Sequence, residues 1–138
     1  MINILMVDDD EDDRLLFEDV IKETSLLCQL HNAVDGQDMF DKLQATSNAE
    51  LPDLILLDLN MPRMDVREAL EKIKSDPRLR LIPVVILTTS NAETDIIKSY
   101  DCGASSYIPK PVTFDELTEK IIALTDYWFD VVRLPDKK

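Results

Sequence analysis

Three aspartates and a lysine lie at the ends of short apolar runs in this sequence, where their side chains could act together. Asp8 and Asp9 directly follow one run, Asp58 directly follows another, and Lys110 lies just after a third. Carboxylates gathered in a partly desolvated cleft repel one another, so such a cluster predicts a bound cation. Hard oxygen ligands favour Mg²⁺ or, failing that, Mn²⁺. The sequence therefore predicts a divalent metal site.

A lysine beside that metal site would allow phosphoryl transfer. The ammonium of Lys110 adds a positive charge that, unlike a metal, can follow a moving oxygen. With that charge in place an anionic phosphoryl group can approach a carboxylate, which attacks it and forms an acyl phosphate. Asp58 is predicted to be this phosphoacceptor, because it stands alone at the end of its run, whereas Asp8 and Asp9 are paired as metal ligands.

Each of these residues also has an ordinary structural interpretation. Aspartates often end strands, a lysine before proline can be part of a turn, and Thr88 can be a β-branched strand residue. The acids at 10–13 are interpreted as a solvated helix start, which the helix dipole favours. The functional interpretation rests on the gathering of the Asp8–Asp9 pair with Asp58, Thr88 and Lys110 at one predicted sheet edge.

The elements that must position these residues are predicted from apolar patterning. The runs 2–7, 53–57, 82–87 and, more weakly, 105–108 are nearly continuous, as in strands buried on both faces of a parallel sheet. A less apolar run, 26–34, is predicted to be a strand at or near an edge. Strands alternating with helices predict an α/β fold of three layers with five helices and right-handed crossovers. Sites in such sheets form at the carboxyl ends of the strands.

Helices are predicted from apolar stripes and capping residues. The predicted stripes are Leu16, Phe17, Val20 and Ile21; Met39, Phe40 and Leu43; Val66, Ala69, Leu70 and Ile73; and Ile96, Ile97 and Tyr100. Three capping boxes are predicted, Asp65 with Glu68, Ser90 with Glu93, and Thr113 with Glu116. Gly103 is predicted to end the fourth helix, and Val112 with Leu117 to form a hydrophobic staple on the fifth.

Length, charge and cysteine content narrow the function classes. A chain of 138 residues predicts one domain, and its net charge of −13 argues against binding to nucleic acid or to a membrane surface. The first residues lack a signal peptide and no run is long enough to span a membrane, so a cytoplasmic location is expected. Cys28, Cys102 and His31 lack metal or disulfide spacing and are interpreted as structural.

Four motifs resemble those of the receiver domains of bacterial two-component response regulators. The motifs are ILMVDDD, LILLDLNMP, VVILTTS and SSYIPKP, in this order and spacing, and the resemblance spans residues 2–125. It implies a doubly wound, flavodoxin-like parallel sheet of five strands in the order 2-1-3-4-5.

The resemblance also implies a role for each site residue. Asp8, Asp9, Asp58 and the backbone carbonyl of Asn60 would hold Mg²⁺, and Asp58 would accept phosphate from a histidine kinase or a small phosphodonor. Thr88 would donate its hydroxyl to the phosphoryl group, and Lys110 would pair with it. Tyr107 would rotate inward as Thr88 moves, and the bond from Lys110 to Pro111 would be cis.

One position departs from the family pattern. Val66 stands where the motif after Asp58 usually has glycine. Valine cannot adopt the positive φ that glycine allows, which puts the geometry of this loop in question. Val66 also extends the apolar stripe of the predicted third helix, and a packing substitution is the favoured interpretation.

The carboxyl end is predicted to form an interface. Residues 1–126 are assigned to the receiver domain and 127–138 to a helical extension and tail, with no output domain. A last helix over 114–133 would overhang the sheet and present Tyr127, Trp128, Phe129 and Val132. The tail most resembles single-domain regulators associated with bacterial phytochrome kinases, which implies a homodimer formed through the fourth and fifth helices and this tail. The alternative is a tail folded back on its own domain.

The leading interpretation is a phosphoacceptor signalling protein that is not an enzyme, although it assists its own phosphorylation and dephosphorylation. It would signal through its helix 4, strand 5 and helix 5 face. An aspartyl-nucleophile phosphatase is disfavoured because Asn60 stands where a general acid is needed. A flavin or nucleotide carrier would need glycine or hydroxyl residues in the first loop, which is acidic instead. A pseudo-receiver that only binds partners is disfavoured by Asp58, Thr88 and Lys110 together.

Overall fold

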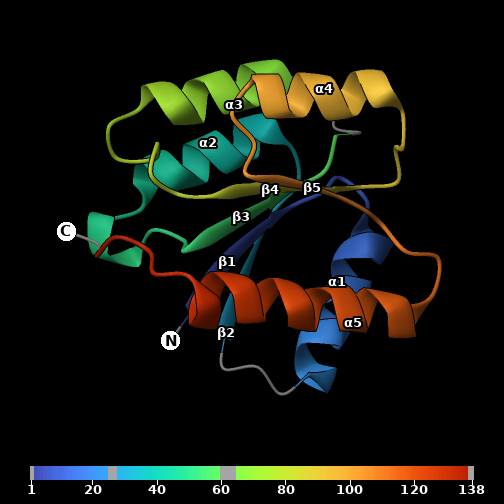
Figure 1. Cartoon of the computed structure of the whole chain (residues 1–138). Coiled ribbons are helices and arrows are strands. Elements are labelled where there is room, and N and C mark those ends of the chain that lie inside the picture. The colour runs from blue at the N-terminus through green and yellow to red at the C-terminus, as the bar shows by residue number, and fades with distance from the viewer. Residues whose placement is uncertain (1, 25–27, 60–64, 137–138) are drawn as a thin grey trace.

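The computed structural model describes residues 2–24, 28–59 and 65–136, and these form a parallel sheet flanked by helices (Figure 1). Five strands lie in the order β2-β1-β3-β4-β5. The strands are β1 (Ile2–Val7), β2 (Cys28–Ala33), β3 (Leu54–Leu57), β4 (Val84–Thr88) and β5 (Ser106–Pro109). The helices are α1 (Glu11–Glu23), α2 (Gly36–Ala45), α3 (Val66–Ser75), α4 (Glu93–Asp101) and α5 (Phe114–Asp126). The predicted flavodoxin-like order and the number of helices are confirmed.

Helices cover both faces of the sheet, which gives the predicted three-layer sandwich. Figure 1 shows α1 and α5 on one face and α2, α3 and α4 on the other. Alternate residues of each central strand point to opposite layers: Ile4 and Met6 of β1 pack with α1 and α5, whereas Leu5 and Val7 pack with α2 and α3. Burial of each such aliphatic side chain stabilises the fold by roughly 1.5–3 kcal/mol. Nearly continuous apolar runs are therefore what a sheet covered on both faces requires.

The less apolar run forms an edge strand, as predicted. β2 pairs only with β1 and contributes partly buried and exposed residues in alternation. One long side of β2 has no neighbouring strand in the described sheet, so its outer positions face solvent or α-helices rather than a second strand. The weaker apolar character of the sequence over 26–34 follows from this position.

Side-chain caps begin α1, α3 and α5. The carboxylate of Asp65 accepts a hydrogen bond from the Glu68 amide at 2.9 Å, and the Thr113 hydroxyl accepts one from the Glu116 amide at 3.2 Å. Both are predicted caps, each a typical contribution of about 1 kcal/mol. The hydrophobic staple predicted before α5 is wrong, because the Val112 side chain is 98% exposed and does not pack on the helix.

The fourth helix differs from its prediction at one end and matches it at the other. α4 begins after Ala92, which has no capping side chain, and the Ser90 hydroxyl instead donates to Asp95 at 2.5 Å. Ile97 and Tyr100, predicted to face inward, are 59% and 50% exposed. Gly103 ends the helix with a φ of +101°, as predicted from its freedom at positive φ.

A Schellman motif forms that end. The amide of Gly103 donates to the Tyr100 carbonyl and the amide of Ala104 donates to the Ser99 carbonyl, both at 3.0 Å. These two bonds satisfy carbonyls that the last helical turn leaves without intrahelical donors.

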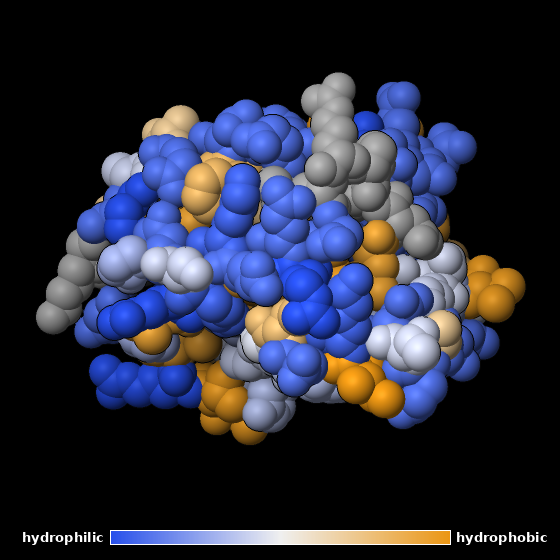
Figure 2. All heavy atoms as spheres, turned by 90° about the horizontal axis from the view of Figure 1, so that it is seen from above, coloured by the Kyte–Doolittle hydropathy of each residue, from blue (hydrophilic) through white to orange (hydrophobic). Residues whose placement is uncertain are grey.

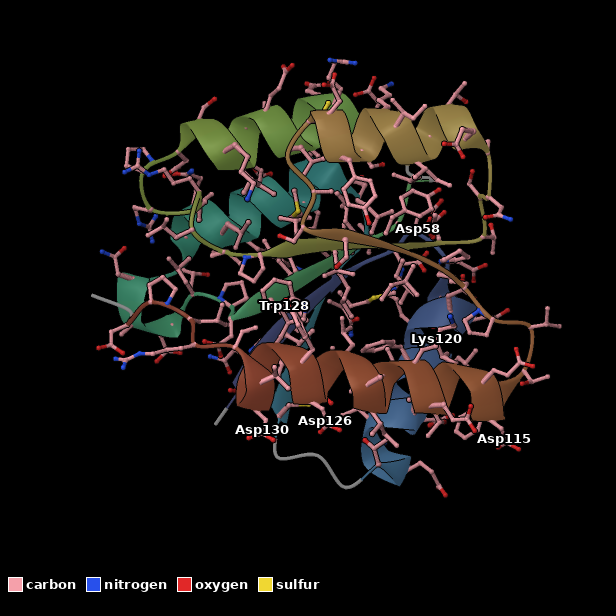
Figure 3. The ribbon with its side chains drawn as sticks, in the orientation of Figure 1. Asp58, Asp115, Lys120, Asp126, Trp128 and Asp130 are labelled. Atoms are coloured by element: carbon pink, nitrogen blue, oxygen red, sulfur yellow. The ribbon has the colours of Figure 1, made fainter. Side chains whose placement is uncertain are left out.

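The carboxyl-terminal segment turns back onto its own domain. A π-helical turn over Tyr127–Val131 follows α5, and the chain becomes extended at Val132. Trp128 and Phe129 are partly buried against the α1 and α5 layer, so their predicted position beyond the sheet edge is wrong. Figure 3 shows Trp128 between this turn and the sheet, well separated from Asp58. The π-helical turn ends the helix two residues before the predicted Arg133, and the tail then lies beside Asp53 and Pro83, which precede β3 and β4.

The surface seen from the side of α3 and α4 is mostly hydrophilic, with separate hydrophobic patches near its margins (Figure 2). Acidic residues exceed basic ones, 28 to 15, which gives the net charge of −13. Among the described residues, none of the helices combines the length and the hydropathy that crossing a bilayer requires.

Candidate functional site

The strand register brings the predicted site residues to one edge of the sheet. Val7 of β1 lies opposite Leu57 of β3, so Asp8 and Asp58, the residues that follow, are neighbours. The amide of Asp58 donates to the Val7 carbonyl at 3.0 Å, which fixes this step between the strands. Thr88 lies opposite Pro109, and the Lys110 amide donates to the Thr88 carbonyl at 2.6 Å. The carboxyl ends of β1, β3, β4 and β5 therefore meet here, as predicted.

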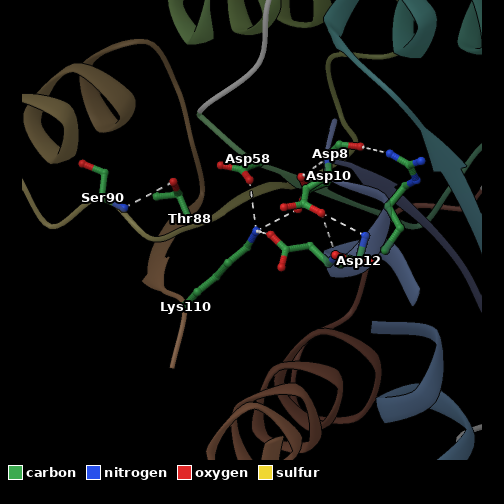
Figure 4. A network of polar contacts seen from close by, with 9 residues as sticks. Asp8, Asp10, Asp12, Asp58, Thr88, Ser90 and Lys110 are labelled. Atoms are coloured by element: carbon green, nitrogen blue, oxygen red, sulfur yellow. Dashed lines mark hydrogen bonds and ion pairs between the residues drawn. The ribbon is translucent and has the colours of Figure 1, made fainter. Parts of the chain in front are cut away.

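The ammonium of Lys110 lies among three carboxylates (Figure 4). Its Nζ is 2.7 Å from Asp8 Oδ2, 3.0 Å from Asp13 Oδ2 and 3.0 Å from Asp58 Oδ2. The side chains of Asp8, Asp58 and Lys110 are 0%, 6% and 11% exposed, and Asp13 is 36% exposed. A charge-assisted network of this kind, mostly shielded from water, holds the three acids in place.

Burial and ion pairing shift the pKa values of Asp8 and Lys110 in opposite directions. Burial raises the pKa of Asp8 above its ordinary value, and the hydrogen bond from Lys110 acts against that rise. For Lys110, burial alone would lower the pKa, but the hydrogen bond to Asp8 and the charge of Asp58 raise it well above its usual range. Lys110 is therefore fully protonated at neutral pH and remains a permanent counter-charge for the carboxylates.

Asp13, rather than Asp9, completes the acidic cluster. Oxygens of Asp8, Asp13 and Asp58 all lie within 4.8 Å of one another, whereas Asp9 is exposed and outside this group. The interpretation of Asp13 as part of a solvated helix start is therefore wrong. The signal that could have identified it is its spacing: Asp13 precedes the buried Phe17 by four residues, which places both on the same face of α1.

The loop between β1 and α1 positions Asp13. Asp10 is the N-cap of α1, and its Oδ1 accepts hydrogen bonds from the amides of Asp12 at 2.9 Å and Asp13 at 3.4 Å. The amide of Asp10 in turn donates to Asp8 Oδ1 at 3.0 Å. Asp10 thus fulfils the predicted role of a helix cap, and the same cap ties the first turn of α1 to the buried Asp8.

Ser90 links the two predicted switch residues. Its amide donates to the Thr88 hydroxyl at 3.4 Å, and its carbonyl accepts a hydrogen bond from the Tyr107 hydroxyl at 2.9 Å. Tyr107 packs against the core cluster that α2 and α3 cover. A displacement of Thr88 would therefore reach the Tyr107 ring through one residue, which was predicted only as a helix cap.

The remaining predicted features of the site have different outcomes. Val66 is 7% exposed and packs in the core, consistent with a packing substitution. The bond between Lys110 and Pro111 is trans, so the predicted cis bond is wrong; trans is the lower-energy isomer even before proline. Asn60, whose carbonyl was predicted to bind metal, lies outside the described residues.

The donor set of the acidic cluster fits a divalent cation. Its ligand atoms are carboxylate oxygens, and two of the three side chains are nearly fully buried. Lys110 pairs with all three carboxylates, while the Arg14 guanidinium donates to the backbone carbonyl of Asp8 at 2.6 Å. Three negative charges and one positive charge leave two negative charges uncompensated. A cation of charge two with a preference for oxygen would neutralise them.

Comparison with known proteins identifies response regulators at the level of the family and of individual relatives. The profile of the response regulator receiver domain family matches residues 4–122. Response regulator Rcp1 of Synechocystis sp. is 38% identical over 135 residues, covering 96% of this chain and 92% of Rcp1.

Two crystal structures are closely similar to this chain. The Mn²⁺-bound form of response regulator Rcp1 has a TM-score of 0.84 and 37% identity, with 98% of this chain and 99% of that chain covered. The phosphorylated cyanobacterial phytochrome response regulator RcpA has a TM-score of 0.87 and 36% identity, with 97% and 98% covered.

Proposed function

This chain belongs to the response regulator receiver domain family of two-component signalling, and we propose that it accepts a phosphoryl group on Asp58 from a sensor histidine kinase. The observation that carries the proposal is the position of Asp58: its buried carboxylate lies at a strand end, 3.0 Å from the Lys110 ammonium. A carboxylate in that place has a fixed position, an adjacent counter-charge and little competition from water.

In the proposed reaction an oxygen of Asp58 attacks the phosphorus of a phosphohistidine or of a small acyl phosphate. A bond forms between that oxygen and phosphorus, and the bond from phosphorus to the donor nitrogen or oxygen breaks, with its electron pair leaving on the donor. Lys110 places its charge beside the transferred phosphoryl oxygens, and the Thr88 hydroxyl is available as a further donor. Thr88 is the last residue of β4, which neighbours β3, and Lys110 follows β5, one strand further on, so the sheet holds both residues near Asp58.

We propose Mg²⁺, or Mn²⁺ in its place, as the metal of this site. Asp8 and Asp58 are the predicted ligands that lie in the cluster, together with Asp13, and Asp9 and the Asn60 carbonyl remain predicted ligands. The bound ion would supply Lewis-acid stabilisation of the phosphoryl charge. One of the two similar crystal structures, that of Rcp1, is a Mn²⁺-bound form, which supports the proposal of a divalent ion here.

Phosphorylation is proposed to act through Thr88 and Tyr107. A phosphoryl group adds charge and three acceptor oxygens, so it would draw the Thr88 hydroxyl toward Asp58. The Ser90 amide donates a hydrogen bond to the Thr88 hydroxyl, and the Ser90 carbonyl accepts one from the Tyr107 hydroxyl. Movement of Thr88 would therefore displace Ser90 and change the position of the Tyr107 ring. The loop from β4 to α4 would then move, and with it the start of α4.

The face formed by α4, β5 and α5 is the proposed signalling surface and the proposed interface of a homodimer. Ile97 and Tyr100 on α4 and Ile122 on α5 are between 41% and 59% exposed. Tyr127 and Val131 extend this apolar surface from the turn after α5, at 50% and 70% exposed. The likeness to phytochrome response regulators supports a phytochrome-type kinase as the proposed donor.

Intact-mass measurement after incubation with acetyl phosphate and Mg²⁺ tests this function. We expect an added mass of one phosphoryl group on the unaltered chain and on an Asp126→Asn control, in which an exposed aspartate of α5 is changed. The Asp58→Asn variant should show no adduct, and omission of Mg²⁺ should greatly reduce it. An adduct that persists in the Asp58→Asn variant would exclude Asp58 as the acceptor.

A further inference from the structure

All three hydrogens of the Lys110 ammonium are engaged in the structure. A lysine ammonium has three donors and no acceptor. Lys110 directs one toward each of Asp8, Asp13 and Asp58, at 2.7, 3.0 and 3.0 Å. A phosphoryl oxygen that arrives at Asp58 and bonds to Lys110 must therefore replace one of these partners.

Asp13 is the partner that can be released at the lowest cost. Its side chain is 36% exposed and can be hydrated when the ammonium leaves, whereas Asp8 and Asp58 are 0% and 6% exposed. Leaving a fully buried carboxylate without its counter-charge costs far more free energy than returning the partly exposed Asp13 carboxylate to water. Competition for Lys110 is therefore between Asp13 and the phosphoryl group.

The position of Asp13 is well defined by the surrounding structure. Its amide bonds to the cap residue Asp10, and Asp10 bonds to Asp8, so a ring of hydrogen bonds runs through Asp8, Asp10, Asp13 and Lys110. Phe17, four residues later on the same helix face, is 1% exposed and anchors α1 to the sheet. The cap and the buried Phe17 therefore hold the Asp13 carboxylate beside Lys110, and neither contact involves Asp58.

We propose that Asp13 is a positioning residue for Lys110, holding the ammonium in the resting protein and competing with the phosphoryl group for it afterwards. This inference rests on the proposed function, because it assumes that Asp58 is phosphorylated. Asp13, in the first turn of α1, would then control the lifetime of the phosphorylated state. Asp13 acts through Lys110, whose ammonium donates to its carboxylate at 3.0 Å.

The direction of the effect follows from charge. Hydrolysis proceeds when water attacks phosphorus, the bond from Asp58 to phosphorus breaks, and inorganic phosphate is released with the carboxylate restored. While Asp13 shares the ammonium, Lys110 stabilises the phosphorylated aspartate less than it could alone. Removal of the Asp13 charge should therefore slow hydrolysis and favour reaction with anionic phosphodonors.

The first test uses the resting protein. The exchange rate of the Lys110 ammonium protons, measured by ¹⁵N-resolved NMR, should rise by roughly threefold to tenfold in Asp13→Asn, since one charged acceptor is lost. Asp12→Asn is the matched control: Asp12 lies on the same turn, and the bond that joins it to the cap comes from its backbone amide. Asp13→Glu should return the rate toward that of the unaltered chain. Equal rates in Asp13→Asn and Asp12→Asn would overturn the proposal.

The second test measures the half-life of the adduct formed with acetyl phosphate and Mg²⁺, after removal of the phosphodonor. We expect Asp13→Asn to lengthen the half-life by roughly threefold to tenfold, with Asp12→Asn within about twofold of the unaltered chain. An unchanged or shortened half-life in Asp13→Asn would contradict the competition. A chain that forms no adduct would instead refute the proposed function, while the ammonium exchange rate would still decide whether Asp13 positions Lys110.

Discussion

At the scale of single residues, the Lys110 ammonium balances only part of the negative charge of the site. The ammonium faces three carboxylates, all within 3.0 Å. Two negative charges remain, and a divalent ion is the natural complement. The lysine and the metal are thus complementary cations, one attached to the sheet and the other exchangeable.

This balance predicts a metal-dependent loss of stability when the lysine is removed. Lys110→Met leaves Asp8 and Asp58 buried without a counter-charge, and we expect the free energy of unfolding to fall by about 3 kcal/mol in the absence of metal. Mg²⁺ at millimolar concentration should recover much of that loss in the variant, because it binds the folded state only. Urea unfolding followed by circular dichroism, with and without Mg²⁺, measures both quantities.

The exposed Lys120 of α5 provides the control for this experiment. Lys120→Met removes the same charge from a surface position, and its unfolding free energy should change by less than about 0.5 kcal/mol in either condition. A Lys110→Met variant as stable as this control would show that the three carboxylates do not need the lysine.

The residues of the site could be predicted where strand ends define them, and not where a helix does. Asp8, Asp58, Thr88 and Lys110 each terminate or follow a strand, and parallel pairing brings such ends together. Asp13 reaches the cluster because α1 begins at Glu11 and turns its third residue toward the sheet. That orientation depends on where the cap forms, so Asp9 was the more natural choice from spacing alone.

At the scale of elements, the two capping boxes on either side of β4 illustrate what limits prediction. Asp65 caps α3 as expected: one carboxylate oxygen accepts from the Glu68 amide at 2.9 Å, and the other lies 3.9 Å from the Lys98 ammonium, a contact that leaves the cap intact. Ser90 belongs instead to the link between Thr88 and Tyr107, and α4 begins three residues later. A capping motif is a local signal, and tertiary contacts of a functional loop can override it.

The same helix shows why an apolar stripe need not face the core. In α4 the buried residue is Ser99, whose hydroxyl donates to the Asp95 carbonyl at 2.8 Å, while Ile97 and Tyr100 face outward. Hydrophobicity alone predicts the opposite orientation. The exposed apolar residues are accounted for if this surface binds another chain. An apolar stripe that packs on a partner and one that packs on the core look the same in a single sequence.

An acid-dependent link joins α2 to the end of α3. Asp76, at the end of α3, accepts hydrogen bonds from the Arg78 amide at 2.8 Å and from the Gln44 side chain at 2.9 Å. The backbone hydrogen bond from Arg78, followed by that from Gln44, lowers the pKa of Asp76 below its ordinary value. A lowered folded-state pKa contributes stability that is present above the unfolded value near 3.9 and is lost as pH falls through the folded one.

We therefore expect Asp76→Asn to destabilise the protein by about 1 kcal/mol at pH 7, with the difference from the unaltered chain shrinking below about pH 4. Urea unfolding at several pH values measures this difference, and Asp101→Asn, at the exposed end of α4, serves as the control. A difference that stays constant down to pH 3 would show that ionisation of Asp76 plays no part.

At the scale of the whole molecule, the proposed phosphoryl site and the proposed interface lie on different elements. The acidic cluster lies at the carboxyl ends of the strands, whereas the exposed apolar residues lie on α4, on α5 and on the turn that follows α5. Under the proposed function, this separation would let a second chain bind while Asp58 stays accessible to a kinase.

The proposed homodimer is tested at this scale. Tyr127→Asp places a charge on the proposed interface and should weaken self-association at least tenfold, measured by sedimentation equilibrium over a range of protein concentrations. Leu15→Asp is the matched control, because Leu15 is also 50% exposed but lies on α1, away from that face. Equal effects of the two substitutions would place the interface elsewhere.

The path of the carboxyl-terminal tail has a practical consequence for tagging. Leu134–Asp136 line a hollow of about 610 Å³ together with Asp53 and Pro83, which precede β3 and β4. This end of the sheet is separated from Asp58 by the length of a strand, about 16 Å over five residues. A fluorophore or an affinity handle attached after residue 136 would thus start from the end of the sheet opposite to Asp58, the proposed phosphoacceptor, so immobilised protein should still accept a kinase.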